Sequence, residues 1–267
     1  MPEGPEATYL ASVLNAKYAG KTLRTVKFVS GRYTHHGLPD KYAEFASGLP
    51  SRLSKVESAG KIIIFYFENG WTAISRLGMT GWWYQQGRAP QWRESASKPN
   101  VIFEFRQAPD LIYTDFRNFG TLSFTRDPSP DIEKLAPSIM ATDITVKTLL
   151  SRMRPRRGDN LLEDALVDQT YIVSGIGNYL KSEILYSARI SPLRKIKDVT
   201  EAEWNSILRE GKRISKLMLA QLYKENPLEY TNAIKVYQRD FDEHGNKIER
   251  HTTKAGRTTF WVSKLQK

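Results

Sequence analysis

The chain has 267 residues, which is enough for one large domain or for two modest domains that each bury a core. Lysine plus arginine number 40 against 29 for aspartate plus glutamate, and the net charge of +11 favours polyanionic partners: nucleic acid first, an anionic membrane surface second. Cysteine is absent, which excludes disulfides, iron–sulfur clusters and cysteine-bound zinc, and the apolar runs are far too short for a membrane span.

The chain opens with the residues MPEGPE, and apolar residues then recur at helical spacing. This spacing predicts an amphipathic helix over residues 7–18, for which the prolines and glutamates would form a favourable first turn. The same opening has a chemical interpretation. If Met1 is removed, Pro2 presents a secondary amine that can attack an aldehyde carbon, with Glu3 beside it as a proton donor. Both interpretations stay open at this point.

Short stretches rich in β-branched and aromatic residues follow, separated by glycine, proline and Asn-Gly turns. They predict a β-sandwich or barrel whose strands lie within residues 22–30, 52–58, 61–68, 71–78, 81–86, 100–107, 110–116 and 121–125. The next stretch, residues 126–138, is rich in proline and charge, and we interpret it as a linker.

Beyond the linker the periodicity becomes helical, and Thr200 with Glu203 has the pattern of a capping box. Helices are predicted within residues 145–154, 160–169, 177–189 and 200–225. The last segment, residues 233–264, returns to a strand pattern with candidate turns at 244–246 and 255–256. This pattern predicts a small C-terminal β-hairpin.

Residues 174–192 carry an internal signal for ligand binding. Gly175 and Gly177 precede a predicted helix, so their backbone N–H groups could hold a phosphate, with Asn178 adding a side-chain donor. Leu180 stands where a dinucleotide-binding motif needs its third glycine, so a nucleotide cofactor is not expected. A nucleic-acid backbone fits the charge better, and an ordinary tight turn between helices is the alternative.

Several single residues could contact nucleic acid, although each also has an ordinary structural interpretation. Arg257 lies at the tip of the predicted hairpin, where it suits a phosphate contact, and Lys61 begins a strongly apolar strand. Three residues at strand–loop junctions could fill the space of a displaced base or could belong to the core: Met79, Arg117 and Phe119.

Two further sets of residues are expected at the surface. The arginine-rich stretch 152–157 is interpreted as a solvated face that could form part of a DNA-binding surface. The 4 histidines show no metal-site spacing and are expected on the surface or in loops: His35, His36, His244 and His251.

Taken in chain order, these stretches resemble the Fpg/Nei (formamidopyrimidine-DNA glycosylase/endonuclease VIII) family of base-excision DNA glycosylases. The motifs are P-E-x-P-E at the N-terminus, G-K before a strand, L-G-M-x-G, D-x-R-x-F-G, D-Q followed by G-I-G-N-Y-L-x-x-E-I-L-Y, and a terminal G-R-x-T. Each motif is weak alone, but their order over nearly the whole chain makes chance agreement negligible. Gly4 resembles the Nei side of the family, because leucine is usual at that position on the Fpg side.

The resemblance implies a multi-domain fold of α and β structure. It has an N-terminal catalytic two-layer β-sandwich with an N-terminal helix (1–128), a helical helix–two-turn–helix (H2TH) domain (129–232) and a C-terminal β-hairpin (233–267). The zinc-binding cysteines of the family are missing while the hairpin-tip motif is kept, which resembles the zincless finger of a Nei-like branch. No metal or other cofactor is expected, and three residues are expected to pack the hairpin instead: Tyr237, Phe260 and Trp261.

The resemblance also implies catalytic roles. Pro2 would be the nucleophile, Glu3 the general acid that assists opening of the deoxyribose, and Glu6 an acidic residue near the site. Lys61 matches a lysine of the same site that contacts the phosphate beside the lesion. An N-terminal amine has a pKa of about 7.7–8.0 and is partly neutral near physiological pH. The expected activity is that of a bifunctional DNA glycosylase/AP lyase, which works through a Schiff base and β,δ-elimination.

The remaining matched residues would bind DNA. Asn178 and Arg257 match phosphate contacts of the H2TH domain and the hairpin, and the void left by the flipped nucleotide would be filled by Met79, Arg117 and Phe119. The expected partner is double-stranded DNA with damaged bases or abasic sites, bound by a monomer without a membrane. The expected location is intracellular, with DNA in a nucleus or in the cytoplasm or nucleoid, and not secreted.

The Nei-like opening favours oxidised pyrimidines such as thymine glycol and 5-hydroxyuracil, with hydantoins and abasic sites also expected. An Fpg-like glycosylase for 8-oxoguanine and formamidopyrimidine is one alternative. A non-catalytic module that binds damaged DNA is another, although the joint retention of four residues argues against it: Pro2, Glu3, Glu6 and Lys61. An N-terminal-proline tautomerase shares the amine, but neither the length nor the basic helical half suits that class.

Overall fold

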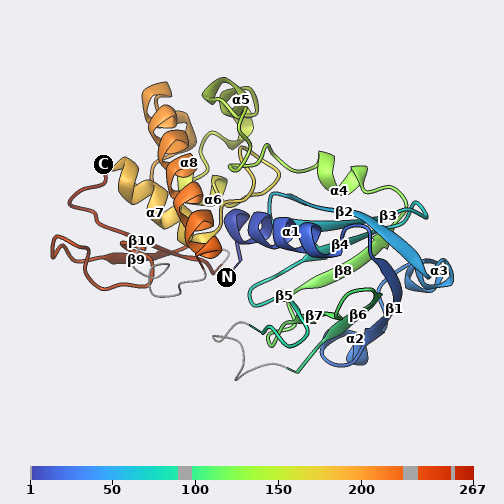
Figure 1. The fold of residues 1–267 in the computed structure, drawn as a ribbon. Helices are drawn as coiled ribbons and strands as arrows, with labels where there is room; N and C mark the ends of the chain where they lie inside the picture. Colours follow the sequence, from blue (N-terminus) through green and yellow to red (C-terminus); the bar gives the residue numbers. More distant parts are fainter. Residues whose placement is uncertain (1, 90–97, 225–233, 254–255) are drawn as a thin grey trace. The chain divides into compact units, whose positions relative to one another are not determined.

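The structure is a computed structural model that describes residues 2–89, 98–224, 234–253 and 256–267 (Figure 1). These residues form two compact units, one of residues 7–132 with Pro2 and one of residues 133–267 with residues 3–6. The predicted domain boundaries, after residue 128 and after residue 232, remain predictions. The predicted element ends at residues 225, 233 and 255 lie outside the described residues.

The first unit is built on an antiparallel sheet of 8 strands in the order β5-β7-β6-β1-β2-β3-β4-β8. The strands are β1 Thr22–Phe28, β2 Ser51–Ala59, β3 Ile62–Phe67, β4 Thr72–Arg76, β5 Trp82–Gln85, β6 Val101–Arg106, β7 Leu111–Thr114 and β8 Thr121–Thr125. β1 pairs along its length with β6 but with β2 only at Thr22 and Leu23, so the sheet turns there from one layer into the next. Every predicted strand segment is present.

Buried aromatic side chains pack between the two halves of this sheet. The ring of Phe65 on β3 lies 5.3 Å from that of Trp83 on β5 and 5.6 Å from that of Phe103 on β6. The indole Nε1 of Trp83 also donates to the hydroxyl of Ser75 on β4 at 2.9 Å. The apolar residues that predicted the strands therefore form the interior of a two-layer sandwich, which confirms that prediction.

Helix α1 (Gly4–Tyr18) begins earlier than the predicted range of 7–18. The Glu6 carboxylate accepts the Glu3 N–H at 2.7 Å, as the third residue of a helix does in half of a capping box, so the helix starts directly after Glu3. Three short α-helices were not predicted: α2 Arg32–His35, α3 Tyr42–Ser47 and α4 Ser129–Glu133, the last within the predicted linker. All three are too short to produce a helical period in the sequence.

The second unit is mainly helical. Its helices are α5 Val146–Ser151, η2 Pro155–Arg157, α6 Leu162–Ala165, α7 Asn178–Ala188, η3 Ile196–Asp198 and α8 Glu201–Tyr223. The predicted capping box of α8 is confirmed, because Thr200 and Glu203 exchange side-chain-to-backbone hydrogen bonds. The predicted helix over 160–169 ends early at α6, because Asp168 accepts the Thr170 N–H and forms a turn. Within the described part of the chain, no helix is long and apolar enough to cross a membrane.

The C-terminal hairpin pairs β9 (Glu249–Thr252) with β10 (Thr258–Trp261), and β10 lies beside α7 (Figure 1). Its small core consists of Tyr186 from α7 with Val236, Ile248, Phe260 and Val262, against which Tyr237 packs. The packing roles predicted for Tyr237 and Phe260 agree with this cluster. Trp261 is only partly buried and lies outside the cluster, because the alternation of β10 turns Phe260 inward and Trp261 away from it.

Candidate active site

The Glu3 carboxylate binds the N-terminal end of helix α7. It accepts the backbone N–H groups of Gly177 at 2.5 Å, Tyr179 at 2.9 Å and Leu180 at 3.3 Å, and Glu3 is fully buried. These are N–H groups that have no partner within a helix, and the helix dipole favours an anion at this place. The chain segment before α1 is therefore fixed to the second unit by a charged side chain.

Glu6 completes this arrangement. Its carboxylate accepts the Tyr179 hydroxyl at 2.9 and 3.1 Å as well as the Glu3 backbone N–H at 2.7 Å. Gly4 donates its N–H to the Gly175 carbonyl at 2.8 Å, and a Cβ on Gly4 would lie 3.1 Å from that oxygen. The peptide that follows Pro2 is thus held on both sides, and the close backbone approach explains a glycine at position 4.

The prediction that the glycine-flanked turn offers free N–H groups to a phosphate is wrong for this structure. The N–H groups of Gly177, Tyr179 and Leu180 are taken by Glu3, and the N–H of Gly175 is taken by the Gln169 side chain at 2.9 Å. The prediction that an anion binds at this helix end is right, but the anion is the Glu3 carboxylate of the same chain and not a phosphate.

Asn178 and Arg257 remain as candidate phosphate contacts in the second unit. Asn178 is the first residue of α7, and its Oδ1 is buried without a hydrogen-bond partner among the described residues. Arg257 precedes β10 and is exposed. Its backbone is fixed, because Thr253 donates to the Arg257 carbonyl at 2.8 Å and the Arg257 N–H donates to the Thr253 hydroxyl at 3.2 Å.

The three predicted void-filling residues lie on two loops of the first unit. Met79 follows β4 and is partly buried, while Arg117 and Phe119 follow β7 and are exposed, Phe119 to 54%. The Arg117 guanidinium lies 5.0 Å from the centre of the Phe119 ring. An exposed aromatic ring covered by a cation suits insertion into a base stack better than a place in the core.

Contacts between these two loops explain how they are held together. Asp115 accepts the Thr80 hydroxyl and the Gly120 N–H, the latter at 2.6 Å, and the Arg117 N–H donates to the Thr80 hydroxyl at 3.2 Å. Gly78 has φ +61°, and a Cβ there would lie 2.6 Å from the Gly120 nitrogen. The glycines of the two motifs thus permit close loop packing. Asp115, which sequence analysis did not single out, organises both loops.

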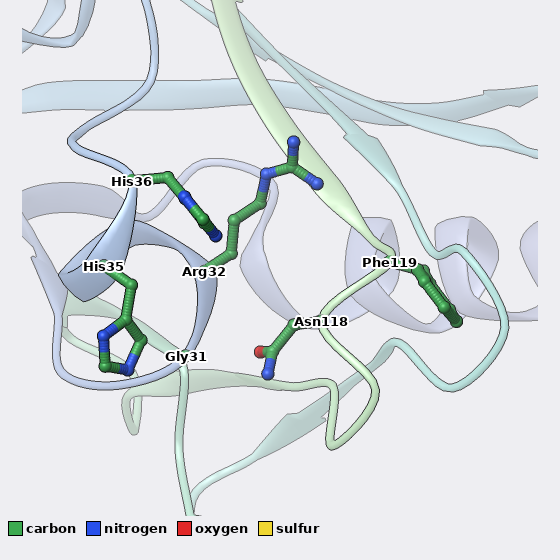
Figure 2. A pocket seen from close by; sticks show the side chains of 6 residues that line it. All are labelled: Gly31, Arg32, His35, His36, Asn118 and Phe119. Carbon is green, nitrogen blue, oxygen red and sulfur yellow. The ribbon is translucent and has the colours of Figure 1, made fainter.

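A cavity of about 370 Å³ opens beside Phe119 (Figure 2). Its lining combines residues of α2 and its flanks with the loop after β7: Gly31, Arg32, His35, His36, Asn118 and Phe119. Gly31 is closely packed, because a Cβ on it would lie 2.0 Å from the Asn100 amide nitrogen and 2.3 Å from the Asn118 side-chain oxygen. The exposed loop that carries Phe119 is therefore supported from the β1–α2 side as well.

Lys61, also in the first unit, lies directly before β3 and is partly buried.

The arginine-rich stretch is less free than predicted. Arg152 donates to the carbonyls of Tyr171 at 2.8 Å and Thr170 at 3.1 Å, and Arg157 pairs with Asp168 at 2.7 Å. These two arginines stabilise the turn after α6 and do not form an open cationic face. Arg154 and Arg156 are both exposed.

The His251 side chain is 38% exposed, which agrees with its predicted place at the surface. It lies in β9, and its Nδ1 is 2.6 Å from the Glu163 carboxylate, which is fully buried. The other buried charged residues that were missed include Lys181 and Glu183, both on α7. The signal that could have identified them is a charged residue inside an apolar helical run, although most such residues face solvent.

Lys181 is fully buried, and its Nζ has no hydrogen-bond partner among the described residues. Burial lowers its pKa from 10.5 to about 8; the carboxylates of Glu163, Asp164 and Glu3 oppose this shift, and Arg257 adds to it. The folded chain therefore binds a proton at Lys181 less readily than the unfolded chain does. Stability should rise with pH from about 8 to 10.5, as the unfolded state loses its extra proton.

Replacing Lys181 by methionine should raise the free energy of unfolding near pH 7 by about 1–3 kcal/mol, because a buried ammonium group without a hydrogen-bond partner among the described residues is removed at similar volume. Urea unfolding at pH 7 and pH 9.5 measures the free energy of unfolding of both proteins. We expect the wild type to gain more stability between the two pH values than Lys181→Met does. A destabilised variant with an unchanged pH dependence would contradict the assignment.

Two family models match the chain in order. The formamidopyrimidine-DNA glycosylase N-terminal domain matches residues 1–122, and the formamidopyrimidine-DNA glycosylase H2TH domain matches residues 135–222. The described residues contain no group of three or more His, Asp or Glu side chains placed to hold a metal ion.

Curated relatives and solved structures agree with these models. Endonuclease 8 of Salmonella dublin is 27% identical over 282 residues, with 100% of both chains covered. Formamidopyrimidine-DNA glycosylase of Ureaplasma parvum is 26% identical over 223 residues, which cover 82% of this chain and 78% of that one. Lactococcus lactis formamidopyrimidine-DNA glycosylase, solved non-covalently bound to DNA containing an AP site, matches 99% of both chains with a TM-score of 0.80 at 22% identity.

These similarities confirm the predicted fold class: an N-terminal β-sandwich followed by an H2TH helical domain. They do not separate the Nei-like branch from the Fpg-like branch, because relatives of both names are about equally similar. From the two matched domains and the relatives that align over the full length, the chain belongs to the Fpg/Nei family of DNA glycosylases.

Proposed function

We propose that the chain is a bifunctional DNA glycosylase/AP lyase that removes oxidised bases through a Schiff base on the amine of Pro2. The observation that carries the proposal is the fixed N-terminal segment. Glu3 accepts three N–H groups of the α7 end, and Glu6 accepts the Tyr179 hydroxyl and the Glu3 N–H. A segment held in this way fixes the backbone that carries Pro2, as a positioned nucleophile requires.

The proposed reaction begins when the neutral Pro2 nitrogen, exposed by removal of Met1, attacks C1′ of the damaged nucleotide. The bond from C1′ to the base breaks, and the base leaves with the electron pair and takes up a proton. The attacking amine then releases its proton to Glu3, whose carboxylate accepts hydrogen bonds in this structure. Glu3 passes the proton to the deoxyribose ring oxygen as its bond to C1′ opens, which leaves an iminium between Pro2 and the sugar.

The iminium then acts as an electron sink. It acidifies the C2′ proton, whose loss expels the 3′ phosphate, and a second elimination expels the 5′ phosphate. Because Pro2 is a secondary amine, its adduct is cationic without further protonation. The product is a one-nucleotide gap with phosphate at both ends.

DNA binding in this proposal uses both units. Lys61, Asn178 and Arg257 would contact phosphates, and the net charge of +11 favours a polyanion. The exposed loop with Arg117 and Phe119, together with Met79, would fill the void left by the flipped nucleotide. The proposed substrates are oxidised pyrimidines, hydantoins and abasic sites in double-stranded DNA, within the cell. Solved structures of related proteins contain DNA with an abasic site or with Fapy-dG.

A panel of duplexes tests this function: one with an abasic site and others with thymine glycol, 5-hydroxyuracil, a hydantoin or 8-oxoguanine. We expect nicking of the abasic duplex with phosphate at both ends, faster excision of the oxidised pyrimidines than of 8-oxoguanine, and no loss of activity with a chelator. Faster excision of 8-oxoguanine would support the Fpg-like alternative. Binding of all these duplexes without nicking would support the non-catalytic alternative.

A further inference from the structure

A fully buried carboxylate joins helix α6 to both strands of the C-terminal hairpin. Glu163 of α6 lies 2.6 Å from Nδ1 of His251 on β9, and its other oxygen accepts the hydroxyl of Thr259 on β10. Glu163 and Thr259 have no solvent exposure. A charge at this depth is stable only with such partners, so the contacts hold the hairpin in one position.

The two hairpin residues that bind Glu163 lie directly opposite each other. Thr259 pairs with His251, and the next pair toward the tip is Thr258 with Thr252, whose hydroxyls lie 3.3 Å apart. One step further, Thr253 and Arg257 exchange the hydrogen bonds that fix the Arg257 backbone. The carboxylate therefore fixes the ladder two steps from Arg257.

Nearby charges show that this cluster is electrostatically connected to the hairpin tip. The ammonium group of buried Lys181 interacts with the carboxylates of Glu163 and Asp164 and is repelled by Arg257. Its neighbour Ser182 accepts the Phe260 N–H at 3.2 Å, which attaches β10 to α7. No cysteine is present to hold the hairpin through zinc. The Glu163 contacts therefore add a buried polar attachment of both hairpin strands to α6.

We propose that Glu163, His251 and Thr259 are positioning residues that hold the hairpin tip so that Arg257 meets a DNA phosphate. The proposal rests on the function proposed above, since it assigns Arg257 to DNA. Glu163 touches neither substrate nor reacting atoms in this scheme and acts only through Arg257. Its effect must therefore disappear when Arg257 is absent.

Binding of the full chain to a duplex with a tetrahydrofuran abasic analogue, measured at fixed salt, tests the proposal. Glu163→Gln should weaken binding about 10-fold, as expected when a charge-assisted contact loses its geometry. In an Arg257→Ala background the same substitution should change affinity less than about 2-fold, the signature of coupled residues. Equal losses in both backgrounds, or no loss in either, would overturn the proposal.

Matched variants separate positioning from folding. Glu249→Gln removes an exposed carboxylate of β9 that binds Ser263 and should leave affinity unchanged. If Glu163→Gln fails to fold, Thr259→Val replaces it, with an expected loss of about 3-fold because one hydrogen bond is removed and the contact between Glu163 and His251 is kept. The rate of borohydride trapping at saturating DNA should stay within about 2-fold of wild type, since the Pro2 segment is untouched.

A measurement without DNA keeps this inference separate from the proposed function. Hydrogen exchange of the segment Thr258–Trp261 in free protein should be faster in Glu163→Gln than in wild type or Glu249→Gln. Unchanged exchange would overturn the positioning role even if the enzyme is active. Failure of the wild type to bind or nick damaged DNA would instead overturn the proposed function, and the exchange result would still decide whether Glu163 holds the hairpin.

Discussion

Retention of Met1, or acetylation of the Pro2 amine, is expected to reduce borohydride trapping on abasic-site DNA by at least about 10³-fold, because either change removes the nucleophile. Pro2→Gly keeps an N-terminal amine but loses the ring, and we expect a smaller, still large loss. The ring of Pro2 restricts how the amine is oriented on the peptide that Glu3 and Glu6 hold in place, and glycine loses this restriction.

Two controls make this result specific to the amine. Affinity for the tetrahydrofuran duplex should change only a few-fold in the blocked proteins, because the proposed phosphate contacts of Lys61, Asn178 and Arg257 remain. Peptide mapping of the trapped wild-type protein should locate the sugar adduct on the first residue. Equal trapping by protein that keeps Met1, or an adduct on a lysine, would show that Pro2 is not the nucleophile.

The fold could be predicted where the sequence has a regular period or a local motif. The short β-branched and aromatic stretches between turn residues predicted every strand of the sandwich, and Thr200 with Glu203 predicted the start of α8. Helices α2 and α3, which have four and six residues, were not found this way. Helix α7 was predicted, but all its residues from Tyr179 to Tyr186 are buried. The spacing of its apolar residues in the sequence therefore does not indicate which side of the helix faces the hairpin.

The predicted site residues came from motifs, whereas the contacts that organise them join positions far apart in the chain. Glu3 binds N–H groups 174–177 residues away, and Glu163 binds partners 88 and 96 residues away. In the sequence alone, Glu163 and Glu183 are ordinary acidic residues of helices. Only the tertiary fold shows that they are buried and that hairpin residues are their partners.

Replacing Glu183 by alanine is expected to lower the free energy of unfolding by about 3 kcal/mol, because buried N–H groups left without an acceptor cost about 1–3 kcal/mol each. The Glu183 carboxylate accepts the N–H groups of Lys235 and Val236, each at 2.9 Å, and of Tyr237 at 2.8 Å. Val236 is fully buried, so water cannot replace the lost acceptor without opening the hairpin core.

Urea unfolding followed by tryptophan fluorescence measures the loss. The matched control is Glu243→Ala, which removes an exposed ion pair with Lys235 and should cost less than about 1 kcal/mol. Glu183→Gln, which keeps one acceptor oxygen, should fall between the two. Since Arg257 is carried by the same hairpin, Glu183→Ala should also weaken binding to the abasic-analogue duplex at temperatures where the protein remains folded. Equal stability of Glu183→Ala and Glu243→Ala would contradict this prediction, because the Glu183 acceptor would then contribute nothing measurable to stability.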